Sequence, residues 1–235
     1  MKKRILVAGI LLIGLGGLAS VQLFHRPSSQ PPQALQTSFQ YETPRPLQPF
    51  ELQDQNGHQF DNDKLKQKWS LIFAGYTSCP DVCPTTLGKL SAVYPKLAQV
   101  APIQVILLSV DPERDSQSKL KDYLAFFNPE FIGLRAEHPA LLPFSRDLGL
   151  VYSLVGDGPD YQVDHSASLI LISPDGRRYA TIKPSSQTPG QLPQIRNDEL
   201  LADFRTLVTQ YQGPHYPPKE PSHSYTIFSF EKRQK

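Results

Sequence analysis

The sequence predicts an α/β protein whose mixed central sheet carries helices on both faces. Residues 71–75 form an apolar run, residues 85–99 place apolar side chains at helical spacing, and residues 103–110 form a second, almost unbroken apolar run. Unbroken apolar runs of this length are typical of strands that are buried on both faces. A strand, a helix and a strand, followed by a helix, a hairpin and a last helix, is the order of a thioredoxin-like fold.

The other elements can be placed from turn signals and helical periodicity. The dipeptide Asn56-Gly57 indicates a hairpin between residues 50–52 and residues 58–60. Further along the chain we expect helices at residues 116–127 and 141–148, strands at residues 168–172 and 179–182, and a helix at residues 197–211.

Residues 1–24 are expected to form a single transmembrane helix that anchors the chain. Residues 1–4 read Met-Lys-Lys-Arg, and residues 5–24 carry no charge. At about 1.5 Å per residue this stretch is about 30 Å long, the thickness of the hydrocarbon core of a bilayer. The basic start places the N-terminus in the cytoplasm and the rest of the chain on the outer, periplasmic or extracytoplasmic, side. Cleavage of a signal peptide near residues 17–19, Gly-Leu-Ala, is the alternative.

Proline-rich segments flank the expected domain. Residues 25–46 are rich in Pro, Gln and Ser and lack an apolar period, so we interpret them as a linker. The folded domain is expected at residues 47–212, and a proline-rich tail at residues 213–235. The net charge of +2 is too small to indicate a nucleic-acid partner, and none is expected.

Cys79 and Cys83 are the two cysteines of the chain. A structural disulfide is one interpretation, but a bridge that closes so short a loop restrains the unfolded chain little. The pair lies where a predicted strand meets a predicted helix, and a helix N-terminus lowers the pKa of a thiol. Cysteines four positions apart on a helical turn lie about 6 Å apart, close enough to share a metal ion or form a disulfide. Two buried structural thiols are the remaining alternative.

His165 is the candidate for a third ligand. In thioredoxin-like proteins the loop before the strand predicted at residues 168–172 lies beside the N-terminus of the first helix. Thiolates favour Cu(I) or zinc, and three ligands are one short of a closed structural zinc site. Such an open site suits copper that must be received and released. A histidine of the surface or core is the alternative reading, and Asp164 is a candidate for orienting the ring through its other nitrogen.

Three segments resemble the signatures of the Sco/SenC family: residues 75–87 (GYTSCPDVCPTTL), residues 109–115 (SVDPERD) and residues 164–166 (DHS). The resemblance spans residues 49–210 and includes the motifs in order. It implies a thioredoxin-like fold and copper, as Cu(I) or Cu(II), bound by Cys79, Cys83 and His165. It also implies delivery of copper, or of reducing equivalents, to the dinuclear copper site of cytochrome c oxidase. The implied partners are the copper-bearing subunit of that oxidase and a copper donor protein.

Two functions of different classes are compatible with these residues. A metallochaperone, which binds copper without turnover, needs Cys79, Cys83 and His165. A thiol–disulfide oxidoreductase would be an enzyme that uses only the redox pair Cys79 and Cys83 to reduce the cysteines of the oxidase site. The three residues between the cysteines differ from the usual Cys-x-x-Cys motif of oxidoreductases. We therefore expect the metallochaperone, with a peroxidase as a third reading because peroxiredoxins share the fold.

Asp111 and Asp115 are interpreted as structural residues. We expect Asp115 to cap the helix that begins at Ser116, and Asp111 to open a turn before Pro112. A role in acid–base chemistry is the alternative.

Overall fold

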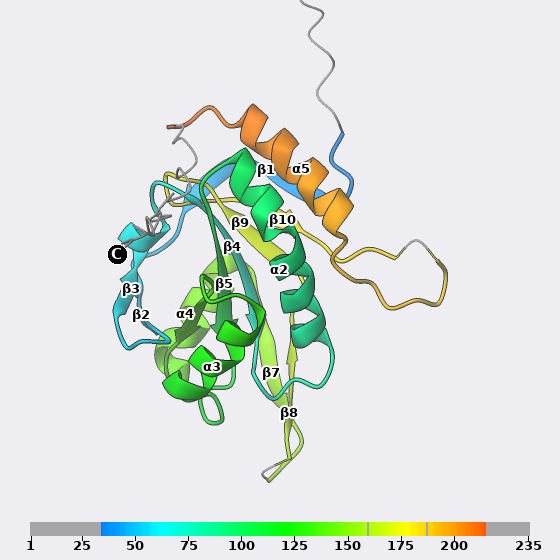
Figure 1. Cartoon of the computed structure of the whole chain (residues 1–235). Helices are drawn as coiled ribbons and strands as arrows, with labels where there is room; N and C mark the ends of the chain where they lie inside the picture. The colour runs from blue at the N-terminus through cyan, green and yellow to red at the C-terminus, as the bar shows by residue number, and fades with distance from the viewer. Residues whose placement is uncertain (1–33, 159, 187, 215–235) are drawn as a thin grey trace, which may run out of the picture. The chain divides into compact units, whose positions relative to one another are not determined.

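A mixed sheet forms the centre of the domain (Figure 1). The computed structural model describes residues 34–214 except for positions 159 and 187. The strands of the sheet are β1 (Ser38–Pro46), β2 (Glu51–Asp54), β3 (Gln59–Asp61), β4 (Trp69–Gly75), β5 (Ile103–Ser109), β6 (Ile132–Arg135), β9 (Leu169–Ile172) and β10 (Arg177–Ile182). Their order is β1-β10-β9-β4-β5-β6-β2-β3. Because β4, β5 and β6 pair in parallel and the other neighbours pair antiparallel, the predicted mixed sheet is confirmed.

Helices cover both faces of this sheet, as the sequence predicted. The helices are η1 (Asn62–Leu65, a 3-10 helix), α2 (Val82–Val100), α3 (Gln117–Phe127), α4 (His138–Leu148) and α5 (Asn197–Gln210). Leu71 and Phe73 of β4 pack with side chains of α2, α3 and α5, whereas Ile72 and Ala74 pack with side chains of α4. This alternation along β4 explains its unbroken apolar sequence, because each face of the strand has a core of its own.

The strand β1 lies within residues 25–46, which were predicted to be a linker. It pairs antiparallel with β10, with Ser38 opposite Ile182. At the start of this strand, the backbone N–H groups of Gln36 and Ser38 donate to the buried carboxylate of Asp203 on α5 at 2.8 Å each. The domain therefore begins before Leu47, the predicted boundary. Exposed and half-buried residues do not alternate regularly along β1, so its sequence gives no period of two that would predict a strand.

The predicted anchor, residues 1–24, the first part of the predicted linker, residues 25–33, and most of the predicted tail lie outside the described residues. Within residues 34–214, none of the helices combines the length and the apolar character of a membrane span.

A separate antiparallel hairpin carries His165 and was not predicted. It consists of β7 (Tyr152–Val155) and β8 (Gln162–His165), which pair with each other and form a two-stranded sheet apart from the main one. His165 is the last residue of β8 and lies opposite Tyr152. From the sequence this histidine was predicted to lie in a loop, because strands of four residues give little periodic signal.

Candidate metal centre

The end of β4 leads directly into the segment that carries both cysteines. Residues 76–81 join β4 to α2, and the backbone N–H of Cys79 donates to the carbonyl of Tyr76 at 3.3 Å. Cys83 is the second residue of α2 and is 1% exposed, whereas Cys79 is partly exposed. The backbone N–H of Cys83 points at the sulfur of Cys79 at 3.5 Å. The helix N-terminus thus offers one of its unpaired donors to that sulfur.

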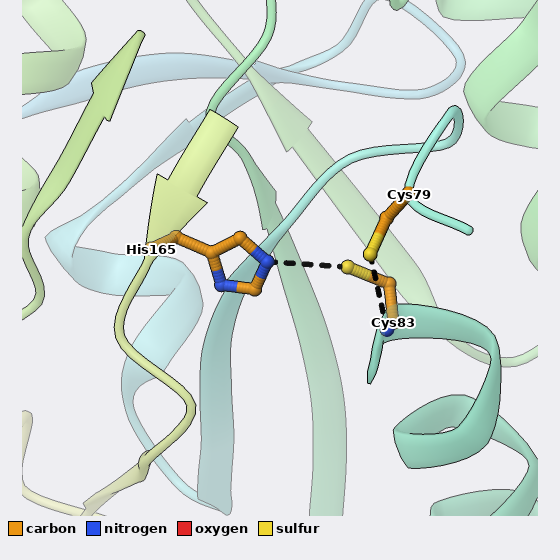
Figure 2. Close-up of side chains that lie close together, drawn as sticks. All are labelled: Cys79, Cys83 and His165. Carbon is orange, nitrogen blue, oxygen red and sulfur yellow. Dashed lines mark hydrogen bonds between the residues drawn. The ribbon is translucent and has the colours of Figure 1, made fainter. Parts of the chain in front are cut away.

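The ring of His165, at the end of β8, points towards the two cysteine side chains (Figure 2). Its Nε2 atom lies 3.4 Å from the Sγ atom of Cys83, and its Nδ1 atom lies 3.1 Å from the carbonyl oxygen of Ser166. A carbonyl oxygen only accepts hydrogen bonds, so a neutral ring carries its hydrogen on Nδ1 and turns the bare Nε2 atom towards the sulfurs. The two sulfurs and this imidazole offer ligand atoms that all lie within 4.8 Å of one another.

The pKa values of the two thiols shift in opposite directions. A hydrogen bond from the Cys83 thiol lowers the pKa of Cys79 to about 3, against the effect of burial, and hydrogen bonds from the backbone N–H groups of Cys83 and Asp81 lower it further. The pKa of Cys83 is raised, because its thiol donates that hydrogen bond and because it is buried. At neutral pH the pair therefore consists of a thiolate at Cys79 and a thiol at Cys83. A metal ion that binds both sulfurs would displace the shared proton.

The donor set fits a soft metal ion. Two sulfurs and one imidazole nitrogen favour copper or zinc over hard cations such as Mg²⁺. Cys79, Cys83 and His165 form the one group of this kind among the described residues. Since Cys79 and His165 are partly exposed, a ligand from another protein can reach the centre at an open position.

Gly75 and Tyr76 shape the space around these candidate ligands, and no role was predicted for either from the sequence. A Cβ atom at Gly75 would lie 3.0 Å from the sulfur of Cys83 and 2.8 Å from Leu107 Cδ1. The ring of Tyr76 packs edge-on against the ring of His165, with centroids 6.0 Å apart. The sequence signal for the role of Gly75 was its position just before the cysteine segment.

Asp164 does not orient His165, and this expectation was wrong. The Nδ1 atom of His165 pairs with the Ser166 carbonyl, while Asp164 is exposed. The physical reason is the alternation of side chains along β8, which turns neighbouring residues to opposite faces.

Asp115 is not the cap of α3, so this expectation was also wrong. The cap is Ser116, whose hydroxyl accepts from the N–H of Lys119 at 3.2 Å. The buried carboxylate of Asp115 instead accepts from the backbone N–H of Thr77 at 3.1 Å and from the Ser109 hydroxyl at 2.7 Å. It thereby holds the segment that leads to Cys79.

Asp111 opens a turn, as expected. Its carbonyl oxygen accepts from the backbone N–H groups of Arg114 at 3.2 Å and of Asp115 at 2.9 Å. Its side chain, however, is fully buried and bonds to Arg114 and Tyr161.

The fold and the cluster define a class: a thioredoxin-like domain with two thiols and an imidazole gathered where the central strand β4 meets α2. The SCO1/SenC family model matches residues 40–197. The chain belongs to this family, and the family expected from the sequence motifs is confirmed.

Individual relatives agree with this assignment. An SCO2-like protein of Rickettsia conorii is 34% identical over 199 residues, which cover 83% of this chain and 96% of that protein. The structure is similar to that of Bradyrhizobium japonicum ScoI with copper bound, at 34% identity and a TM-score of 0.55, over 68% of this chain and 98% of the other. It is also similar to Arabidopsis thaliana ScoI with copper bound, at 28% identity and a TM-score of 0.61, over 70% and 99% of the two chains.

Proposed function

We propose that this chain is a copper metallochaperone that binds copper through Cys79, Cys83 and His165. The observation that carries the proposal is the convergence of two sulfurs and the bare imidazole nitrogen within 4.8 Å. The copper-bound structures of two family members support copper as the metal.

The arrangement suits a cargo that is bound and then released. Cys79 is already a thiolate, and Cys83 gives up its proton when the metal binds. Because Cys79 and His165 are partly exposed and Cys83 is buried, a ligand from a partner would replace the outer two donors before the inner one.

The proposed destination is the dinuclear copper site of cytochrome c oxidase. Membership of the SCO1/SenC family and the likeness of the sequence motifs to its signatures support this step. The proposed partners are the copper-bearing subunit of the oxidase and a copper donor protein. Residues 1–24 would anchor the chain in the membrane by a single span, with the domain on the outer side.

A thiol–disulfide oxidoreductase is the second candidate, because the lowered pKa of Cys79 makes it a nucleophile. The Cys79 thiolate would attack a disulfide of the partner and release one partner thiolate. Cys83, after losing its proton, would then attack the mixed disulfide, release the second partner thiolate and leave Cys79 and Cys83 oxidised. Two electrons would pass to the partner, and His165 would not be needed as a ligand.

Copper binding by the full chain, purified in detergent, tests the proposed function. The reduced protein should bind about one copper ion, since it offers one three-ligand site. The oxidised protein should bind none, because a disulfide has no thiolate to donate. Stoichiometric binding by a folded Cys79→Ser, Cys83→Ser double variant would refute the proposal.

A further inference from the structure

The position of His165 is not fixed by the hydrogen bonds of the main sheet. The hairpin β7–β8 is a separate two-stranded sheet, whereas the cysteines follow β4 in the main sheet. Val163 of β8 is buried in the core, but apolar packing is non-directional. Besides the short chain connection to β9, directional side-chain contacts between the hairpin and the main sheet help to set the 3.4 Å distance between His165 Nε2 and Cys83 Sγ.

Arg114 supplies such contacts to Tyr161, the residue just before β8. Its Nη1 atom donates to the Tyr161 carbonyl at 2.9 Å, and its guanidinium carbon lies 3.8 Å from the centroid of the Tyr161 ring. Its Nε atom donates to one carboxylate oxygen of Asp111 at 2.5 Å, and the Tyr161 hydroxyl donates to the other oxygen, also at 2.5 Å. Arg114, Asp111 and Tyr161 thus form a closed ring of contacts.

This ring ties the hairpin to the rigid centre of the sheet. Asp111 lies just beyond the end of β5, all of whose residues are buried, and is itself fully buried. The guanidinium of Arg114 also lies 5.5 Å from the centroid of the Tyr76 ring, which in turn packs against the ring of His165. The Tyr76 hydroxyl donates to the side chain of Gln162 on β8 at 3.3 Å.

The same loop holds the other half of the metal centre. Asp115, four positions after Asp111, accepts from both the backbone N–H and the hydroxyl of Thr77, at 3.1 and 2.5 Å. Thr77 lies in the segment that leads to Cys79. Residues 111–115 therefore contact the cysteine segment on one side and the histidine hairpin on the other.

We propose that Arg114, oriented by Asp111, is a positioning residue that holds His165 at ligand distance from Cys83. Arg114 acts through Tyr161 and the hairpin, and does not bind the metal. The copper readouts below rest on the proposed function. A lysine at this position keeps the charge but loses the planar fork and the stacking on the tyrosine ring.

A double-mutant cycle in the full chain tests the proposal. Arg114→Lys should weaken Cu(II) binding about tenfold, as is found when residues behind a metal ligand are changed. It should also reduce the coupling of an imidazole nitrogen in the Cu(II) EPR spectrum. In a His165→Ala background the same substitution should have no further effect, since the ligand through which it acts is gone.

Arg178→Lys is the matched control. Arg178 also stacks on a tyrosine, with its guanidinium carbon 4.4 Å from the Tyr41 ring, and donates to the carbonyl of Asp147 at 3.1 Å. It lies on β10, and these contacts to Tyr41 and Asp147 lie outside the ring formed by Arg114, Asp111 and Tyr161. This control should leave Cu(II) binding unchanged in both backgrounds. Equal weakening by Arg114→Lys in both backgrounds, or no weakening in either, would overturn the proposal.

A second variant and a copper-free measurement complete the test. If Arg114→Lys does not fold, Tyr161→Phe removes only the hydroxyl that bonds to Asp111, with Tyr41→Phe as its control. In the copper-free variant, amide hydrogen exchange should be faster in β8 than in the copper-free wild type, and it should be unchanged in α2. If the wild type binds no copper, the proposed function fails. Amide exchange in β8 of the variant equal to that of the wild type would separately refute the positioning role of Arg114.

Discussion

The Nε2 atom of His165 lies 3.4 Å from the Sγ atom of Cys83, although 82 positions separate the two residues. Cys83 is held in the first turn of α2, and His165 ends a hairpin outside the main sheet. The cysteine pair alone could serve a reductase, whereas this contact adds a third donor to the proposed copper site.

Replacement of His165 should separate the two candidate functions. His165→Ala should weaken Cu(II) binding by at least about tenfold, because Cu(II) favours imidazole. Tenfold is the smallest loss usually found when a residue that orients a metal ligand is changed, and loss of the ligand itself should cost no less. The rate of disulfide reduction should change less, since it depends on the cysteines and their access. Copper affinity, reduction rate and oxidase assembly at limiting copper should be measured on the same variant.

His58→Ala is the control for this substitution, because His58 has an exposed side chain and pairs with Asp54 away from the cysteines. Normal oxidase assembly by His165→Ala at limiting copper, together with a clear loss of copper binding, would count against the metallochaperone and favour the reductase.

Cys79 should stay reactive in acid. Because its pKa is lowered to about 3, its alkylation by iodoacetamide in the copper-free protein should change little between about pH 8 and pH 5. An ordinary thiol with a pKa of about 8.5 would lose about tenfold in rate per pH unit over this range. Cys83→Ala removes the main hydrogen-bond donor, so the pKa of Cys79 should rise and the rate should fall with acidification. A tenfold loss per pH unit in the wild type would contradict the assignment of Cys79 as a thiolate.

Gly75→Ala should disturb the candidate metal centre by crowding the sulfur of Cys83. The added Cβ atom would lie 2.8 Å from Leu107 Cδ1 and 3.0 Å from Cys83 Sγ, so either the core or the sulfur must move. We expect a loss of about 1–3 kcal/mol in the free energy of unfolding, together with weaker copper binding. Gly88→Ala is the matched control, because a Cβ atom there has no neighbour within 4 Å and α2 should gain about 0.5–1 kcal/mol. Copper affinity equal to that of the wild type in Gly75→Ala would show that the sulfur does not need this space.

Asp203→Asn should loosen the start of the domain. The carboxylate accepts from the backbone N–H groups of Gln36, Thr37 and Ser38 at 2.8, 2.9 and 2.8 Å, and an amide cannot accept all three bonds with both of its heavy atoms. The free energy of unfolding should fall by about 1–3 kcal/mol, while copper affinity stays unchanged. Asp122→Asn, at an exposed position of α3, should have little effect in the same denaturant titration. Equal stability of the two variants would mean that the segment before β1 is not held by Asp203.

The N-terminal segment should act as an uncleaved anchor. The prediction follows from the uncharged residues 5–24 behind a basic start. Membrane fractionation combined with intact-mass analysis should find the full-length chain in the membrane. Recovery of a soluble form that begins near Ser20 would identify the segment as a signal peptide instead.

The parts of the fold that could be predicted are those with strong local patterns. The buried strands β4 and β5 are unbroken apolar runs, and α2 repeats leucine and valine at helical spacing, so their type followed from periodicity. The strands of the hairpin β7–β8 are only four residues long, and the edge strand β1 pairs with β10, which is distant in sequence, so their own residues give little signal. Asp115 was misassigned for a similar reason: its place before a helix suggested a cap, while its real partner is Thr77, 38 positions away.

The sequence by itself determined the class of fold, the place of Cys79 and Cys83 at the strand–helix junction, and the chemistry that these residue types can perform. Those properties depend on local periodicity and on side-chain type, and both can be read directly from the sequence. Only the tertiary structure decided which nitrogen of His165 faces the sulfurs, which cysteine carries the thiolate, and which residues hold the two halves of the site together. These three features depend on burial and on distances between segments that lie far apart in the chain. Such distances are set when the hairpin and the loop at residues 111–115 pack against the ends of β4 and β5.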